Sequence, residues 1–79
     1  MPDPRSAATH EFGVRVRVQR RTLGFSQEVL AAAAGLHWSY VGQVERGERN
    51  LTLHNICKLA QALEVDPSQL VEGLRVPFP

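Results

Sequence analysis

The sequence contains few of the features that stabilise secreted proteins or anchor membrane proteins. Cys57 is the only cysteine among 79 residues, so a disulfide within the chain is excluded and a reducing compartment is expected. No apolar run approaches the roughly 18 residues of a membrane span, and nothing resembles a signal peptide. We therefore expect a cytoplasmic protein without a membrane partner. A chain of this length forms one small domain, which buries only about 60% of its unfolded surface.

The chain also lacks the side-chain sets that catalysis and metal binding require. We find no pair of carboxylates, no nucleophile with a base and no glycine-rich phosphate loop. His54 and Cys57 lie three residues apart on a predicted helix, but no third or fourth metal ligand lies near them. We therefore expect no enzymatic activity, no metal and no cofactor, and we interpret Cys57 as a small packed hydrophobic residue.

The net charge of +1 is small, but the charges are unevenly distributed. Residues 15–49 contain six arginines and three glutamates, a local balance of +3, whereas residues 1–14 and 51–79 each sum to −1. Arginine has a planar fork of donors that suits phosphate and guanine. On charge alone, this segment is either a solvated face or a nucleic-acid contact.

The segment Val14–Val18 reads VRVRV, and its strict alternation taken alone predicts a strand. On a helix, however, Phe12, Val16 and Leu23 fall on one stripe, and the segments downstream all have helical patterns. We therefore predict a helix here. Gln19 lies on the same buried stripe and must find a hydrogen-bond partner.

Capping residues divide the remaining sequence into four more helices. Ser26 caps a helix over Gln27–Ala34, and Gly35 is its expected left-handed end. The next helix runs from about Trp38 to Arg46, and two further helices begin after Thr52 and after Asp66. The predicted fold is all-α with five helices in a domain over residues 10–74, flanked by flexible tails over residues 1–9 and 75–79.

The second and third predicted helices form a helix-turn-helix through the turn at residues 34–37. A helical wheel of the third places Tyr40, Val41 and Val44 toward the core. Its outer face carries Ser39, Gly42, Gln43 and Arg46, with Trp38 at the edge. Glutamine suits adenine, arginine suits guanine or phosphate, and a glycine permits close approach to base edges. The alternative is an ordinary solvent face with a tolerated glycine.

Residues 26–53 read S-Q-E-x-L-A-x-x-A-G-L-x-x-S-Y-V-x-x-V-E-R-G-E-R-N-L-T-L, and residues 58–70 read K-L-A-Q-A-L-E-V-D-P-S-Q-L. These motifs resemble the Cro/repressor-type (XRE) helix-turn-helix family over nearly the whole chain, from Phe12 to Leu74. Within the family, the segment over residues 40–53 is most similar to the controller proteins of restriction–modification systems. Antitoxins and phage-type repressors share much of the pattern and remain alternatives.

The resemblance implies a compact, lambda-repressor-like domain that regulates transcription by binding a palindromic operator in double-stranded DNA as a homodimer. It assigns Gln27 to a phosphate contact, a role that suits the start of a helix. Four residues match base-facing positions: Trp38, Ser39, Gly42 and Gln43. Four others match positions that touch the DNA backbone or flank the operator centre: Tyr40, Arg46, Arg49 and Asn50. If the protein activates transcription, Glu28 is a candidate contact for RNA polymerase.

Two residues depart from the family pattern. Controller proteins often have arginine where this chain has Trp38, so a guanine contact is not expected there. The indole either packs on a thymine methyl or sugar edge or shields the start of the helix. His37 occupies the N-cap position, where Ser, Thr or Asp is usual. It either caps the helix, touches a phosphate when protonated or is a plain turn residue.

A domain this small presents few DNA contacts, and two copies about 34 Å apart would double them. The last predicted helix offers Leu70, Val71 and Leu74, more apolar side chains than a short helix buries alone. We predict a two-fold interface from the last two helices with Leu70 and Leu74 at its centre. The alternative is that these leucines close the monomer core. The competing function is a protein-interaction module that kept the fold but reads no bases.

Overall fold

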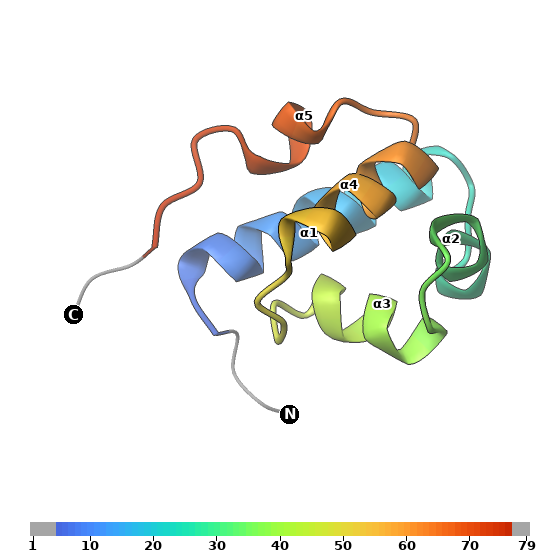
Figure 1. Cartoon of the computed structure of the whole chain (residues 1–79), viewed down its shortest axis with the longest axis horizontal. Helices are drawn as coiled ribbons and strands as arrows, with labels where there is room; N and C mark the ends of the chain where they lie inside the picture. The colour runs from blue at the N-terminus through green and yellow to red at the C-terminus, as the bar shows by residue number, and fades with distance from the viewer. Residues whose placement is uncertain (1–4, 77–79) are drawn as a thin grey trace.

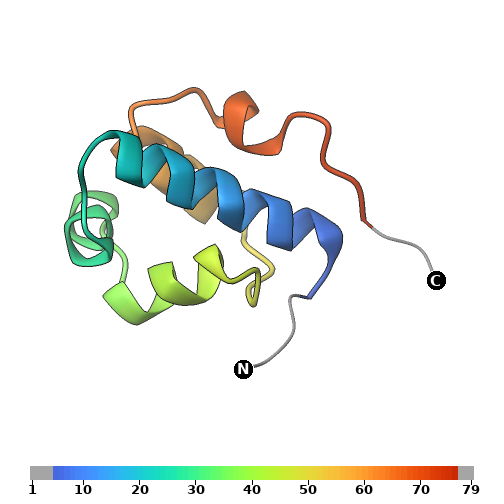
Figure 2. The same ribbon diagram turned by 180° about the vertical axis from the view of Figure 1, so that it is seen from behind.

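The computed structural model describes residues 5–76 and contains five helices in that range (Figure 1). They are α1 (Ala7–Thr22), α2 (Gln27–Ala34), α3 (Trp38–Glu45), α4 (Leu53–Ala62) and α5 (Pro67–Val71). Figures 1 and 2 show the long α1 between α3 on one side and α5 on the other, and α4 packs against α2 and α5. The prediction of an all-α, five-helix fold is confirmed.

Short polar side chains cap the helix starts. Ser26, Thr52 and Asp66, the three predicted caps, each accept a hydrogen bond from a backbone N–H in the first turn of the helix that follows. Ser6 caps α1, so the helix begins at Ala7 and includes three residues predicted to belong to a flexible tail. Of the predicted tails, residues 1–4 and 77–79 lie outside the described residues. Helix α3 ends at Glu45, one residue earlier than predicted.

The alternating segment of α1 is helical because its residues belong to two faces of the helix. Phe12 and Val16 are buried, whereas Val14 and Val18 remain 37% and 57% exposed. Gln19 finds the hydrogen-bond partner that its position demands, because its amide nitrogen donates to the backbone carbonyl of Leu63 at 3.0 Å. The helix interpretation and the requirement on Gln19 are both confirmed.

The core combines side chains from every helix. Its fully buried large members are Val16, Leu30, Val41, Val44, Leu59, Leu63 and Leu70. The backbones of α1 and α3 lie close together at Gly13, where an added Cβ would lie 2.6 Å from the carbonyl oxygen of Glu45. This contact between backbones fixes the position of α3 against α1. In the described part of the chain, no helix has the length and apolar character needed to cross a membrane.

Candidate nucleic-acid interface

Helices α2 and α3 are joined by a tight turn that sets the angle between them. Gly35 adopts the left-handed conformation at φ 68° and ψ 37°, as predicted for the residue that ends α2. The N–H of Leu36 donates back to the carbonyl of Ala31 at 2.9 Å, and the Leu36 side chain packs against the core. The turn therefore directs α3 across α2, the arrangement expected of a helix-turn-helix.

The start of α3 presents an exposed aromatic pair. Trp38 is 57% exposed, and its ring stacks on that of His37 with 5.8 Å between the ring centroids. His37 Nδ1 accepts a hydrogen bond from the backbone N–H of Ser39 at 3.2 Å and lies 2.7 Å from the Ser39 hydroxyl. Of the alternatives for His37, the structure therefore supports helix capping. Trp38 and Ser39 are both exposed to solvent, so a second molecule could contact their side chains.

A chain of contacts runs from α4 to the outer face of α3. The side-chain amide of Asn55 donates to the hydroxyl of Tyr40 at 3.1 Å. The guanidinium carbon of Arg49 lies 5.0 Å from the centroid of the Tyr40 ring, and Arg49 Nε donates to Gln43 Oε1 at 2.8 Å. Tyr40 is half-buried, so its ring packs against the core as predicted while its hydroxyl remains available for this hydrogen bond.

The side chain of Gln27 lies beside Gly42, a contact that the sequence did not predict. Gly42 is buried, and a Cβ added there would lie 3.3 Å from Arg46 Nη1 and 3.5 Å from Gln27 Oε1. The prediction that Gly42 presents an open backbone to base edges is therefore corrected. Its missing side chain instead leaves room for the side chains of Gln27 and Arg46 to cross α3.

Glu45 holds this part of the molecule together. Its side chain is fully buried and accepts hydrogen bonds from Arg20 Nε at 2.6 Å and Nη2 at 3.0 Å. Arg17 Nε and Gln27 Nε2 also donate to it, at 3.3 and 3.1 Å. Burial alone would raise the pKa of Glu45, but the hydrogen bonds from Arg20, Gln27 and Arg17 outweigh it, so the pKa lies below its ordinary value.

Sequence reasoning missed the role of Glu45, although a signal was present. At about 100° per residue, Glu45 falls between Val41 and Trp38 on the same helical wheel, at the border of the inward face, where a buried ionised group requires a partner. The buried Arg20, four residues after the buried Val16 on α1, is that partner. Arg20 lies beside the apolar stripe of α1, and Glu45 lies beside the apolar stripe of α3. Two opposite charges beside two stripes that pack together were the signal for a buried ion pair.

The loop after α3 carries a second, more exposed set of charges. Arg46 Nε donates to Glu48 Oε2 at 2.6 Å, and this hydrogen bond raises the pKa of Arg46. Arg49 and Asn50 are exposed and follow directly in the chain. The loop therefore places two arginines and an exposed asparagine beside α3.

The apolar surface predicted on α5 is smaller than expected. Leu70 is only 2% exposed and belongs to the core, which corrects its placement at the centre of a dimer interface. A side chain inside the core of one protomer is not available to a second protomer. Leu74 packs against the core but is only half-buried, so it stays a predicted contact of the dimer. Val71 remains 38% exposed.

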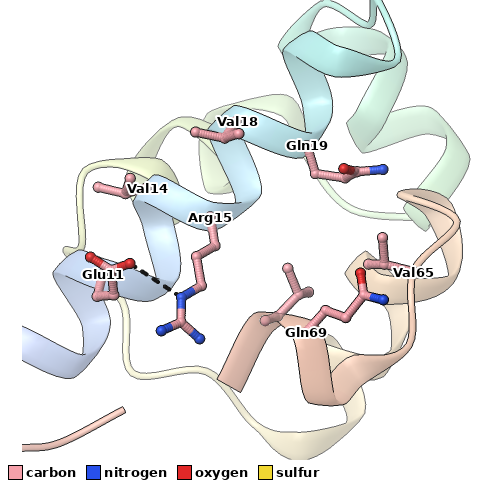
Figure 3. A pocket seen from close by; sticks show the side chains of 8 residues that line it. Glu11, Val14, Arg15, Val18, Gln19, Val65 and Gln69 are labelled. Atoms are coloured by element: carbon pink, nitrogen blue, oxygen red, sulfur yellow. Dashed lines mark hydrogen bonds and ion pairs between the residues drawn. The ribbon is translucent and has the colours of Figure 1, made fainter. Parts of the chain in front are cut away.

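Beside α5 lies an open hollow of about 250 Å³, across α1 from α3 (Figure 3). Its apolar lining comes from Val14, Val18, Val65 and Leu70. Arg15 crosses one end, where its Nε bonds to Glu11 at 3.2 Å and its Nη1 donates to the carbonyl of Glu72 at 2.7 Å. This face therefore offers exposed valines framed by an ion pair.

The potential metal ligands and Cys57 do not form a site. Within residues 5–76, no three His, Cys, Asp or Glu side chains are arranged to hold a metal ion. Cys57 is exposed on α4, which corrects its interpretation as a packed hydrophobic residue.

Comparison with known proteins identifies similar chains. The model of the HTH_3 family, described as helix-turn-helix, matches residues 16–70. The chain is 42% identical to the control protein C.BamHI of Bacillus amyloliquefaciens over 62 residues, 77% of this chain and 76% of the relative.

Two solved structures extend the comparison. The restriction–modification controller protein C.AhdI from Aeromonas hydrophila superposes with a TM-score of 0.77 at 53% identity, covering 78% of this chain and 94% of that one. The P22 c2 repressor in complex with a synthetic operator superposes with a TM-score of 0.73 at 31% identity, covering 78% and 94% of the two chains.

Proposed function

Because the chain belongs to the HTH_3 helix-turn-helix family, we propose that it is a transcriptional regulator that binds double-stranded DNA sequence-specifically. The observation that carries this proposal is the outer face of α3, where Trp38, Ser39 and Gln43 face solvent or lie half-exposed beside the arginines of the following loop. An α-helix with such a face fits the major groove, where side chains reach base edges while neighbouring cations contact phosphates.

In the proposed complex, α3 lies in the major groove and the start of α2 lies against the DNA backbone. Trp38, Ser39 and Gln43 face the bases, and Gln27 approaches a phosphate from the first turn of α2, where backbone N–H groups favour an anion. Gln27 Nε2 donates one N–H to Glu45, which holds the side chain in place, and its second N–H is the donor for the phosphate. The outer arginines and Asn50 contact the backbone or flank the operator centre.

We propose further that the protein acts as a homodimer on a palindromic operator and is a controller-type autoregulator. The similarity to control protein C.BamHI and controller protein C.AhdI supports the controller assignment. We propose Val14, Val18 and Val71 for the dimer contact, because all three are exposed and Val71 directly follows Leu70, which lines the same hollow as Val14 and Val18. With dimerisation coupled to DNA binding, protein concentration itself would set the occupancy of the operator.

A phage-type repressor is the second candidate function. The similarity to the P22 c2 repressor, whose structure contains an operator, favours it. Activation and repression differ in the contact with RNA polymerase, for which Glu28, exposed on the first turn of α2, is the proposed residue. A Glu28→Lys variant of an activator would bind its operator normally but lose activation in a reporter assay.

Selection of bound duplexes from a random DNA library at about physiological salt tests the proposed function. We expect enrichment of a palindrome whose half-sites lie about one helical turn, roughly 34 Å, apart. Enrichment of a single half-site would support DNA recognition but reject the dimer. Absence of any enrichment would reject base recognition and favour the protein-interaction alternative.

A further inference from the structure

We infer that Arg49 is a positioning residue that sets the base preference of Gln43, an inference that rests on the proposed function. The guanidinium holds the amide of Gln43 through the 2.8 Å hydrogen bond from Arg49 Nε to Gln43 Oε1. Arg49 thereby acts on sequence readout through another side chain, in addition to any phosphate that its remaining N–H groups contact.

The chemistry of arginine fixes which end of the amide faces it. A guanidinium has only donors, so the Gln43 atom that faces it must be the oxygen. The amide nitrogen of Gln43 therefore points away from Arg49, and within residues 5–76 it makes no hydrogen bond. Its two N–H groups are the part of Gln43 that remains free to meet a base edge.

Arg49 is held in place by contacts within the protein. Its guanidinium carbon lies 5.0 Å from the centroid of the Tyr40 ring, in the range of a cation–π interaction. The Tyr40 hydroxyl is fixed in turn by the amide of Asn55 on α4. The four side chains line one open hollow of about 390 Å³ beside α3. The orientation of Gln43 is thus linked to the packed body of the protein before DNA arrives.

An oriented amide differs from a free one in the bases that it favours. A free glutamine presents its oxygen and nitrogen together and pairs with adenine N6 and N7. With its oxygen bound to Arg49, Gln43 offers donors, which match the N7 and O6 acceptors of guanine best and the N4 donor of cytosine worst. We therefore expect Gln43 to select guanine above adenine, and we expect loss of Arg49 to shift that preference toward adenine.

The experiment compares duplex selection and binding for the full chain and for Arg49→Ala, Gln43→Ala and the double variant. Arg49→Ala should change the preference at the same base pair as Gln43→Ala, with a loss of discrimination of about tenfold, or about 1.4 kcal/mol. The double variant should lose little more at that base pair than either single variant. The control is Arg21→Ala. Arg21 is exposed on α1, so this substitution also removes one positive charge, and it should leave the base preference unchanged.

Three outcomes would contradict the inference in distinguishable ways. A uniform loss of affinity by Arg49→Ala, with unchanged preference at the Gln43 base pair, would make Arg49 a phosphate contact only. Additive effects of the two substitutions would show that the residues act independently. A wild-type chain that enriches no sequence would overturn the inference together with the proposed function, whereas the first two outcomes leave the proposed function intact. Thermal melting followed by circular dichroism verifies that each variant is folded.

Discussion

The two faces of α3 differ in burial and in the partners of their side chains. On the inner face, Val41, Val44 and Glu45 are buried, and Glu45 accepts hydrogen bonds from residues on both α1 and α2. On the outer face, Trp38 and Ser39 are exposed. One helix of eight residues therefore secures the fold with one side and leaves the other side available for recognition.

The ion pairs on the two faces also differ in how exposed their side chains are. Arg20 and Glu45 have side chains 10% and 0% exposed, whereas those of Arg46 and Glu48 are 37% and 13% exposed. Both pairs have a shortest distance of 2.6 Å, so geometry does not separate them. Burial does, because a buried charge that loses its partner is left uncompensated in a medium of low dielectric constant.

The largest expected effect comes from truncating the inner acid. Glu45→Ala leaves the Arg20 guanidinium buried without its counterion and should lower the free energy of unfolding by about 3–5 kcal/mol. This is a large share of the roughly 5–15 kcal/mol typical of a domain. Urea denaturation followed by circular dichroism measures it. The matched control is Glu48→Ala, for which a loss of about 1 kcal/mol or less is expected. Equal losses in the two variants would remove the distinction between the faces.

Gly13→Ala, a substitution on α1, tests the contact between α1 and α3. The new Cβ would meet backbone carbonyls of α3, which cannot move aside as a flexible side chain would. The helices must separate, and we expect a loss of about 1–3 kcal/mol in the free energy of unfolding, typical of an overpacked core. Thermal or urea unfolding provides the measurement. An unchanged or higher stability would show that α3 tolerates a shift on α1.

The pH dependence of stability should reflect the inner face more than the outer. The pKa of Glu45 is lowered in the folded protein, so its contribution is fully present above the unfolded value of about 4.3 and is lost as the pH falls through the folded value. Urea unfolding between pH 7 and pH 3 should show this decline, with a shallower slope in Glu45→Gln. The effect should be smaller than truncation, because a protonated carboxyl still accepts hydrogen bonds from Arg20.

Asp66 requires a control in that titration. The hydrogen bond from the backbone N–H of Ser68 also lowers the pKa of Asp66, so this cap gives a decline of the same sign. Comparison of Asp66→Asn with Glu45→Gln separates the two contributions. A slope that changes only in Asp66→Asn would exclude Glu45 as the source.

The smallest expected effect on stability is at Gly42. An added Cβ there meets only the ends of two flexible side chains, those of Gln27 and Arg46. Alanine also favours a helix by roughly 1 kcal/mol over glycine, so Gly42→Ala should change the free energy of unfolding by no more than about 1 kcal/mol in either direction. Its affinity for the selected DNA should fall, because the guanidinium of Arg46, 3.3 Å from the added Cβ, must shift. Stability measured beside binding by fluorescence anisotropy separates these effects.

Much of the fold follows from local sequence signals. Helix caps, the left-handed Gly35 and the apolar stripes identify the five helices because they act within a few residues of chain. Gln19 shows that the need for a hydrogen-bond partner can be inferred from the helical stripe before the partner is known. That partner, the carbonyl of Leu63, lies 44 residues away and depends on how α1 packs. The early start of α1 was missed because two adjacent alanines after Ser6 have no polar–apolar pattern.

The candidate site was predicted as a set of residues but not as an arrangement. The outer positions of α3 follow from the helical period, which is a local property. The covering of Gly42 by Gln27 and the four-way bonding of Glu45 depend on the crossing of α2 and α1 over α3, which no local pattern contains. Leu70 was misassigned for a similar reason, because the groove that accepts it exists only once α1 and α4 have packed.

The exposure of Trp38 and Ser39 on a helix secured from behind has a consequence for protein engineering. A library randomised at these two positions would consist largely of folded molecules. Selection would then separate its members by the DNA sequence they prefer and not by the amount of folded protein they give. Gln43 and Arg49 would enter such a library as a linked pair, with both codons varied together. The outer face of α3 would then be a recognition surface whose residues can be exchanged while the rest of the domain stays the same.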